Sequence, residues 1–158
     1  MRKEPAMAEL TTQLAVFMKN VPGTLHEILK SITDARINIE GIMVNDAVDY
    51  AVVRLVVDAP MKAIHILGER GLLVVESDIL SLEMPDEPGE LLGLAGKLSK
   101  GKINISYIYG STPRAGGRPQ VFIHTSDNAK VVRMLGKGDG CSPCCGAPVR
   151  AAKKSGKK

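Results

Sequence analysis

Apolar and polar residues follow two different periods along this chain, and the two periods alternate in a regular order. Leu80, Leu82 and Met84 are separated by single polar residues. A period of two is typical of a strand with one buried face, and segment 13–18 is a less regular counterpart. Both segments are therefore expected to be strands, and each leads into a Pro-Gly pair.

Beyond each Pro-Gly pair, the apolar residues change to the spacing i, i+3, i+4, i+7, which places them on one face of a helix. The positions are Leu25, Ile28, Leu29 and Ile32 in the first half and Leu91, Leu94, Ala95 and Leu98 in the second. A second strand is then expected around Ile37 and Ile39, and again around Ile103 and Ile105.

The remaining segments complete the same order in each half of the chain. Further strands are expected at 50–58, 72–77 and 119–127, and further helices at 59–71 and 128–138. Asp58 and Asp127 stand at N-cap positions for the second helices. The order strand–helix–strand–strand–helix–strand predicts an α+β fold of two ferredoxin-like βαββαβ units, with antiparallel sheets and helices on one face.

The two halves are related by an internal duplication. Segments 13–44 and 79–110 align without a gap at a shift of 66 residues and share nine identities in 32 positions. A repeat predicts two structural units, which we place at 10–78 and 79–140, before a basic, Cys-containing tail at 141–158 that we expect to be disordered. The second unit lacks a recognisable fourth strand, because the sequence that follows it, CSPCCGAPV, contains two prolines and a glycine. Either that edge stays open or another segment, for example from a partner chain, completes it.

Composition narrows the class of protein. The formal net charge of +4 and the pI of about 9.0 come from the tail, because residues 141–158 hold five basic and no acidic residues, which leaves 16 basic against 17 acidic residues elsewhere. Aromatic residues make up 3% of the chain, so few rings could stack on bases. No apolar run approaches the roughly 20 residues of a membrane span, and the start lacks a secretory signal. We expect a cytoplasmic protein that binds neither nucleic acid nor a membrane.

Chemistry-bearing residues form no catalytic or metal centre that can be recognised from the sequence. Cys141, Cys144 and Cys145 include a C-x-x-C spacing, but a structural zinc site needs four ligands and no second motif is present. His65 and Glu69 are four apart on an expected helix, a spacing that is common by accident. No nucleophile has an identifiable base, and no cofactor fingerprint occurs. We therefore expect no enzyme activity, no metal and no cofactor.

The Pro-Gly segments are the best candidates for a binding site. Each helix after them begins with unsatisfied N–H groups, which attract a small anion such as a carboxylate. Asn20 and Asp86, two residues before the proline, can accept hydrogen bonds from an ammonium group. Asn38 and Asn104 alternate with isoleucines, and we expect them beside these loops, pointing away from the helix-covered face. Together these groups suit a zwitterion, that is, a free amino acid.

A purely structural interpretation of the same residues is that Pro-Gly forms a turn and that Asn20 or Asp86 caps the helix. The matching 18-residue spacings from Asn20 to Asn38 and from Asp86 to Asn104 do not decide the question, because duplication preserves spacings by descent. Acidic residues near Asp86 would repel a carboxylate, so the first loop is the better candidate for a filled site.

The run Asn/Asp-x-Pro-Gly-x-Leu, followed by a helix and Ile-Asn-Ile, resembles the signature of ACT domains, which are regulatory modules that bind amino acids. The resemblance covers both units, residues 13–136, and the whole chain is similar to stand-alone tandem ACT proteins. It implies that sheets pair side by side and that ligand sites form at the seam between modules. By position, the implied ligand-binding residues are Asn20, Val21, Pro22, Gly23, Thr24, Leu25 and Asn38 in the first unit, and Asp86, Glu87, Pro88, Gly89, Leu91 and Asn104 in the second.

We therefore expect a non-catalytic protein that binds a free amino acid between its modules, forms a homodimer and exerts allosteric regulation on a partner enzyme or transporter. The alternative is a protein–protein regulatory subunit of a metabolic enzyme without its own ligand. RNA-recognition modules share this order of elements, but the third strands here lack the basic and aromatic residues that stack bases. The identity of the amino acid stays open, although Ile42, Met43, Ile108 and Tyr109 would suit an apolar side chain.

Overall fold

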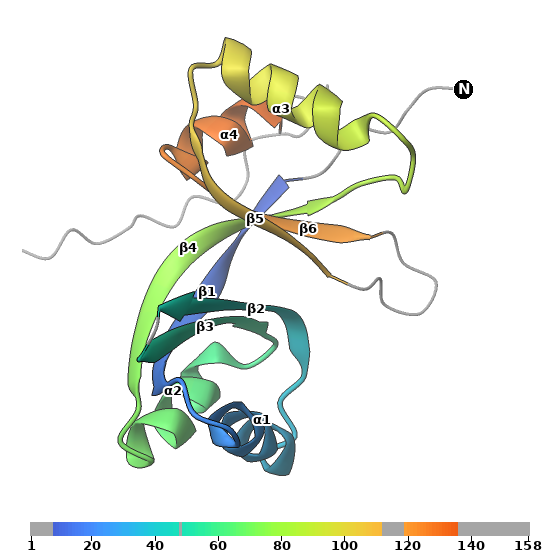
Figure 1. Ribbon diagram of the computed structural model, residues 1–158. Helices are drawn as coiled ribbons and strands as arrows, with labels where there is room; N and C mark the ends of the chain where they lie inside the picture. The colour runs from blue at the N-terminus through green and yellow to red at the C-terminus, as the bar shows by residue number, and fades with distance from the viewer. Residues whose placement is uncertain (1–7, 48, 112–118, 136–158) are drawn as a thin grey trace, which may run out of the picture.

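The helices and strands follow one another in the predicted order (Figure 1). The computed structural model describes residues 8–47, 49–111 and 119–135. Its elements are β1 (Ala8–Lys19), α1 (Thr24–Asp34), β2 (Ile39–Ala47), β3 (Tyr50–Val57), α2 (Pro60–Glu69), β4 (Leu73–Glu83), α3 (Glu90–Lys100), β5 (Ile105–Ser111), β6 (Gln120–Thr125) and α4 (Asn128–Leu135). All neighbouring strands are antiparallel, which confirms the predicted fold class of two ferredoxin-like units.

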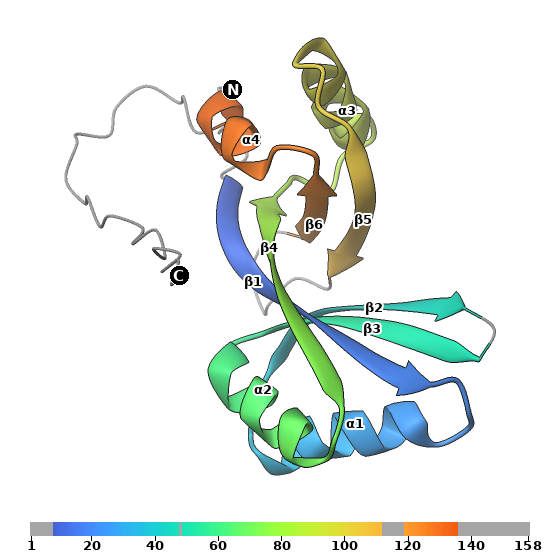
Figure 2. The ribbon, with the colours of Figure 1, turned by 90° about the vertical axis from the view of Figure 1, so that its left-hand side faces the viewer.

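The two units share one six-stranded sheet, with the strand order β2-β3-β1-β4-β6-β5 (Figure 2). Its centre is the long ladder between β1 and β4, which runs from the pair Ala8–Leu82 to the pair Phe17–Leu73. The first unit has the strand order β2-β3-β1-β4. The second unit has the equivalent order β5-β6-β4-β1, counted from the opposite edge of the sheet. Both central strands therefore belong to both units.

The start of β1 supplies the fourth strand of the second unit, which the sequence of that unit does not provide. Residues 8–12 pair with residues 78–82 of β4 and occupy the position of the last strand of the second unit. The strand begins at Ala8 rather than at residue 13, where the apolar pattern starts. Its first residues are half-buried or exposed, and this explains why periodicity did not reveal them. The segment that follows residue 140 lies outside the described residues.

The expected strands 72–77 and 79–84 are a single strand, β4. It passes through the position at which we divided the two units, between Asp78 and Ile79. Glu76 and Asp78 interrupt the apolar pattern because they lie between the two helical layers, where neither layer covers the sheet.

Two apolar cores lie between the sheet and its helices. Under α1 and α2, Leu14 and Val16 of β1 pack with Ile28 and Ile32 of α1, and all four are almost completely buried. Under α3 and α4, the matching core contains Leu80, Leu82, Leu94, Leu98, Ile123 and Val131. Each such side chain contributes about 1.5–3 kcal/mol when fully buried, so the amphipathic helices are held mainly by these contacts.

A third cluster lies on the face of the sheet that none of the described helices, α1 to α4, covers. Val56 of β3, Ile79 of β4 and Phe122 of β6 are buried there, with Tyr107 and Tyr109 of β5 packed against them. These strands come from both units, so the uncovered face curls on itself. The outermost strands β2 and β5 accordingly contact each other. This contact places residues of the two units side by side.

Gln13 of β1 is the polar centre of that curled face and is 1% exposed. Its Nε2 donates to the Tyr107 hydroxyl at 2.7 Å and to Ser77 Oγ at 3.2 Å, and the Tyr109 hydroxyl donates to its Oε1 at 3.0 Å. Burial, with a smaller contribution from Tyr107, raises the pKa of Tyr109 above its ordinary value of 10.0, and Arg54 partly opposes the shift. The amide therefore forms hydrogen bonds with two half-buried tyrosine hydroxyls of the other unit.

The predicted N-caps have different outcomes in the two units. Asp127 accepts a hydrogen bond from the Lys130 N–H at 2.8 Å, as an N-cap does. The prediction for Asp58 is wrong, because α2 begins after Ala59, which makes no side-chain cap. Asp58 instead accepts a hydrogen bond from the Asn38 N–H at 3.0 Å.

We predict that Gly41→Ala destabilises the protein by about 1–3 kcal/mol. A Cβ at this position would lie 2.5 Å from Phe122 Cε2, and Phe122 is fully buried. Urea unfolding measures the loss, with Gly110→Ala as the control because a Cβ there meets nothing within 4 Å. Equal stabilities of the two variants would contradict the packing of Phe122 on Gly41.

A second prediction concerns alkaline pH. Because the pKa of Tyr109 is higher in the folded state, its contribution to stability is fully present below the ordinary value of 10.0 and is lost as the pH rises above it. The free energy of unfolding should therefore fall above that pH in the native protein, and less steeply in Tyr109→Phe. Absorbance titration of the three tyrosines should show one that ionises late, and simultaneous ionisation of all three would contradict the burial.

Candidate functional site

Both Pro-Gly loops have the turn geometry that the sequence predicts. The N-cap residues of α1 and α3 are Gly23 and Gly89, with φ of 94° and 96° in the left-handed region. Glycine is the residue that adopts this conformation without strain. Because a glycine occupies each N-cap, Asn20 and Asp86 do not cap these helices.

The turns already use the first amides of the helices. The Thr24 N–H donates to the Val21 carbonyl at 3.3 Å, and the Glu90 N–H donates to the Glu87 carbonyl at 3.4 Å. Val21, Pro22, Glu87, Pro88 and Leu91 are exposed, whereas Leu25 packs against the first core. The loops are thus well-formed turns with accessible outer surfaces.

Asn20 contacts the turn between β2 and β3 of its own unit. Its Nδ2 donates to Asp46 Oδ1 at 2.7 Å, and its backbone N–H donates to the Asp49 carbonyl at 3.0 Å. The side chain is exposed. These contacts fix Asn20 at the C-terminal end of β1.

Asn38 lies at the opposite end of the sheet, so the expectation that it lies beside the first loop is wrong. The strand β3 begins beside Lys19 and ends beside Ile39. At about 3.3 Å per residue, this length separates Asn20 from Asn38 by roughly 23 Å. The cause is topological, because β1 and β2 run in the same direction and α1 returns the chain to the starting edge. Asn104 has the equivalent position in the second unit, and its N–H donates to Ser126 Oγ at 3.1 Å.

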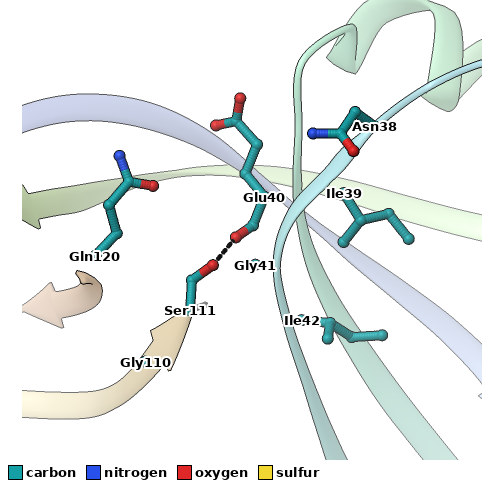
Figure 3. A pocket seen from close by; sticks show the side chains of 8 residues that line it. All are labelled: Asn38, Ile39, Glu40, Gly41, Ile42, Gly110, Ser111 and Gln120. Carbon is teal, nitrogen blue, oxygen red and sulfur yellow. Dashed lines mark hydrogen bonds between the residues drawn. The ribbon is translucent and has the colours of Figure 1, made fainter. Parts of the chain in front are cut away.

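Asn38 instead lines a cleft between the two units (Figure 3). The cleft has a volume of about 230 Å³ and is lined by Asn38, Ile39, Glu40, Gly41 and Ile42 of the first unit and by Gly110, Ser111 and Gln120 of the second. The Ser111 hydroxyl donates a hydrogen bond to the Glu40 carbonyl and joins the two walls. In the view of Figure 3, the Glu40 carboxylate lies between the amides of Asn38 and Gln120. Polar groups therefore line one part of the cleft, and Ile39 and Ile42 line another.

The second unit's wall of the cleft lies beside the second loop. Gln120 is paired with Glu83, the last residue of β4, and the Met84 N–H donates to the Pro119 carbonyl at 3.0 Å. Residues 86–91 follow directly. The structure thus brings Asn38 of the first unit near the loop of the second unit, and not near Asn20.

Besides Asn38, the lining residues with polar side chains are Glu40, Ser111 and Gln120, and none of these three was predicted from the sequence. No motif contains them, because they meet only when the sheet curls and its outer strands touch. The alignment of the repeats could not reveal this contact, since it relates equivalent positions and not contacting ones.

A second cleft lies within the first unit, between α1 and the end of α2. It is lined by Thr24, Glu27, Ile28, Arg70 and Leu72 and has a volume of about 330 Å³. Glu27 and Arg70 form an ion pair at 3.7 Å, and both are largely exposed. Although it is larger, this cleft has only one predicted residue, Thr24, and no contribution from the second unit. The Asn38 cleft is therefore the better candidate.

Metal and membrane sites are not indicated in the part of the chain that the structure describes. His65 and Glu69 form an exposed pair at 3.3 Å, but no group of three or more His, Cys, Asp or Glu residues lies close enough to hold a metal among residues 8–47, 49–111 and 119–135. No helix within these ranges has the length and apolarity needed to cross a membrane. Cys141, Cys144 and Cys145 lie outside the described residues.

Comparison with known proteins is consistent with the duplicated architecture. Residues 10–136 match a family described as ACT domain pair, while no curated protein sequence matches the chain. The crystal structure of protein BT0572 from Bacteroides thetaiotaomicron is 26% identical, with a TM-score of 0.75 over 84% of this chain and 89% of that one. The regulatory subunit of aspartate kinase from Thermus thermophilus is 12% identical, with a TM-score of 0.60 over 87% of this chain and 98% of that one. The crystal structure of aspartokinase alpha and beta subunits is 19% identical, with a TM-score of 0.57 over 85% of this chain and 97% of that one.

We predict that Gly23→Ala and Gly89→Ala each cost about 1–2 kcal/mol of stability, because an L-residue is strained in the left-handed region. The matched control is Gly96→Ala in the interior of α3, where a Cβ meets nothing within 4 Å and where alanine should stabilise by up to about 1 kcal/mol. Thermal unfolding of the three variants measures both the expected loss of stability and the expected gain. A neutral Gly23→Ala would show that the turn does not need this conformation.

Proposed function

The chain belongs to the ACT domain pair family, and from this membership we propose that it is a non-catalytic regulatory protein that binds a free amino acid in the cleft between its two units. The observation that carries the proposal is the position of Asn38 in a cleft whose other wall comes from the second unit. A ligand in that cleft contacts both units and so stabilises the arrangement in which they meet. Differential affinity of this kind is the requirement for allosteric control.

The chemistry of the cleft suits an α-amino acid. The Glu40 carboxylate can accept hydrogen bonds from an ammonium group, and the amides of Asn38 and Gln120 can donate to a carboxylate. The eight described lining residues thus offer both an acceptor for an ammonium group and donors for a carboxylate, as a zwitterion requires. The volume of about 230 Å³ is below the roughly 300–1,000 Å³ of sites for drug-sized ligands. Ile39 and Ile42 favour an apolar side chain on the ligand.

The loop residues implied by the family signature have different places in this proposal. Asn38 contacts the ligand directly, and the loop from Asp86 to Leu91 lies beside the cleft and completes its rim. Asn20 and the loop from Val21 to Leu25 lie at the far end of the first unit. By the symmetry of the two units, they are expected to lie beside Asn104, where they would form the rim of the position that is equivalent to the Asn38 cleft.

The regulated partner is expected to be a metabolic enzyme or a transporter in the cytoplasm, with the chain acting as a homodimer. One protein of similar fold is the regulatory subunit of an aspartate kinase, and another structure holds aspartokinase alpha and beta subunits. These similarities support a role in controlling an enzyme. Phe17, Leu73 and Val75 expose apolar surface on the uncovered face of the first unit, as expected where a protein partner binds. This surface also favours the second candidate, a protein–protein regulatory subunit without its own ligand.

Thermal unfolding in the presence of each of the twenty amino acids tests the proposal. At 100 times its dissociation constant, a ligand adds roughly 2.7 kcal/mol of stability, which raises the melting temperature by several degrees at this chain length. We expect a shift from one amino acid or a few related ones, lost in Asn38→Ala and in Gln120→Ala.

Asn104→Ala is the matched control, because it removes the same amide from the equivalent position of the other unit. It should keep the ligand-induced shift. No shift with any amino acid would contradict ligand binding and leave the partner-only candidate.

A further inference from the structure

The two units are related by a pseudo-twofold axis that can be located from the strand register. The residue numbers of each pair between β1 and β4 add up to 90. The duplication also makes each residue of β1 equivalent to the residue of β4 whose number is higher by 66. Only Thr12 and Asp78 satisfy both relations, so the axis passes between them. Every feature of one unit therefore has an equivalent position in the other.

The same irregularity occurs in both outer strands and confirms the equivalence of individual positions. The β2–β3 register shifts between Ile39 and Gly41, and the β5–β6 register shifts between Ile105 and Tyr107. Tyr107 therefore occupies the position that Gly41 has in the first unit. Arg54 of β3 corresponds to Phe122 of β6, because Leu55 and Ile123 pair with equivalent residues of β1 and β4.

The contacts at the two equivalent positions differ in size. In one, the Phe122 ring lies directly against the backbone of Gly41. In the other, the Arg54 guanidinium carbon lies 4.6 Å from the centre of the Tyr107 ring, and the His124 ring stacks on Tyr107 with 5.0 Å between centroids. The Tyr107 hydroxyl also accepts the hydrogen bond from Gln13. The Phe122 ring thus fills the space beside Gly41 in one unit, and the Tyr107 ring fills the equivalent space in the other.

Two of the polar side chains of the Asn38 cleft, those of Glu40 and Gln120, have no counterpart of the same chemistry at the equivalent position. Its residues would be Asn104, Ile105, Ser106, Tyr107 and Ile108 from the second unit, with Val44, Asn45 and Val52 from the first. Serine replaces the acid, valine replaces the Gln120 amide, and a second valine replaces Gly110. Only the asparagine remains of the three groups that suit an amino acid.

We propose that each chain binds one amino acid, at the Asn38 cleft alone, because the symmetry-related position has serine and valine where that cleft has Glu40 and Gln120. This inference rests on the proposed function, since it concerns the number and place of the same ligand. It assigns the recognition of the ligand to Glu40 and Gln120, whose equivalents in the other unit are Ser106 and Val52. Asn104 then has a structural role at the start of β5.

Native mass spectrometry of the full chain, incubated with a mixture of the twenty amino acids, tests the inference. The mass of the adduct identifies the ligand, and the number of adducts per chain gives the number of sites. We expect one adduct per chain, weakened about tenfold or more in Asn38→Ala, as for loss of a ligand hydrogen bond, and unchanged in Asn104→Ala. Gly110→Leu should also weaken it, because Gly110 lines the cleft and a side chain there meets no neighbour within 4 Å that would hold it away, and circular dichroism checks that each variant is folded.

The outcomes separate the inference from the proposed function. Two adducts per chain, or one adduct that depends on Asn104 and not on Asn38, would overturn the single-site inference while amino-acid binding stands. No adduct on any of the proteins would overturn both. A single adduct that survives both Asn38→Ala and Gly110→Leu would place the ligand elsewhere and also overturn the inference.

Discussion

The antiparallel ladder between β1 and β4 is the interaction on which the rest of the structure depends. Each of these strands completes the sheet of both units, so neither unit has four strands without the other. A backbone hydrogen bond contributes only about 0.5–1.5 kcal/mol net, but the ladder also fixes the register of every other strand. It therefore determines which side chains face the helices and which face the uncovered side.

The curl of the sheet follows from what the uncovered side contains. Gln13, at the centre of the ladder, bonds to both tyrosines of β5, and Phe122 packs on Gly41. A buried amide is stabilising only when its hydrogen bonds are made, so these contacts favour one arrangement of the two units. The outer strands then touch, and the cleft at Asn38 forms between them.

Local patterns were sufficient to predict most of the fold. The helical spacings, the Pro-Gly turns and the 66-residue repeat led to the correct elements, the correct order and the family, and left-handed Gly23 and Gly89 confirm the turns. The start of β1 could not be predicted in the same way, because residues 8–12 are not strongly apolar and are held by pairing with β4. Asn38 was assigned to the wrong loop, since proximity along a motif was taken for proximity in space. Glu40, Ser111 and Gln120 carry no local signal, because their meeting depends on the curvature of the whole sheet.

Sharing of the two central strands also constrains how the chain reaches its fold. The paired residues of β1 and β4 are between 56 and 74 residues apart in the sequence, and pairings of this range are slow to form. The first unit needs β4 before its sheet is complete, and the second needs the first residues of β1, which are synthesised before any other strand of that unit. In domain-by-domain synthesis, the first unit can therefore complete its sheet once β4 has emerged, whereas the second unit cannot form its sheet without β1. The duplication, although visible as two repeats, thus gives a second unit that depends on the first for one of its strands.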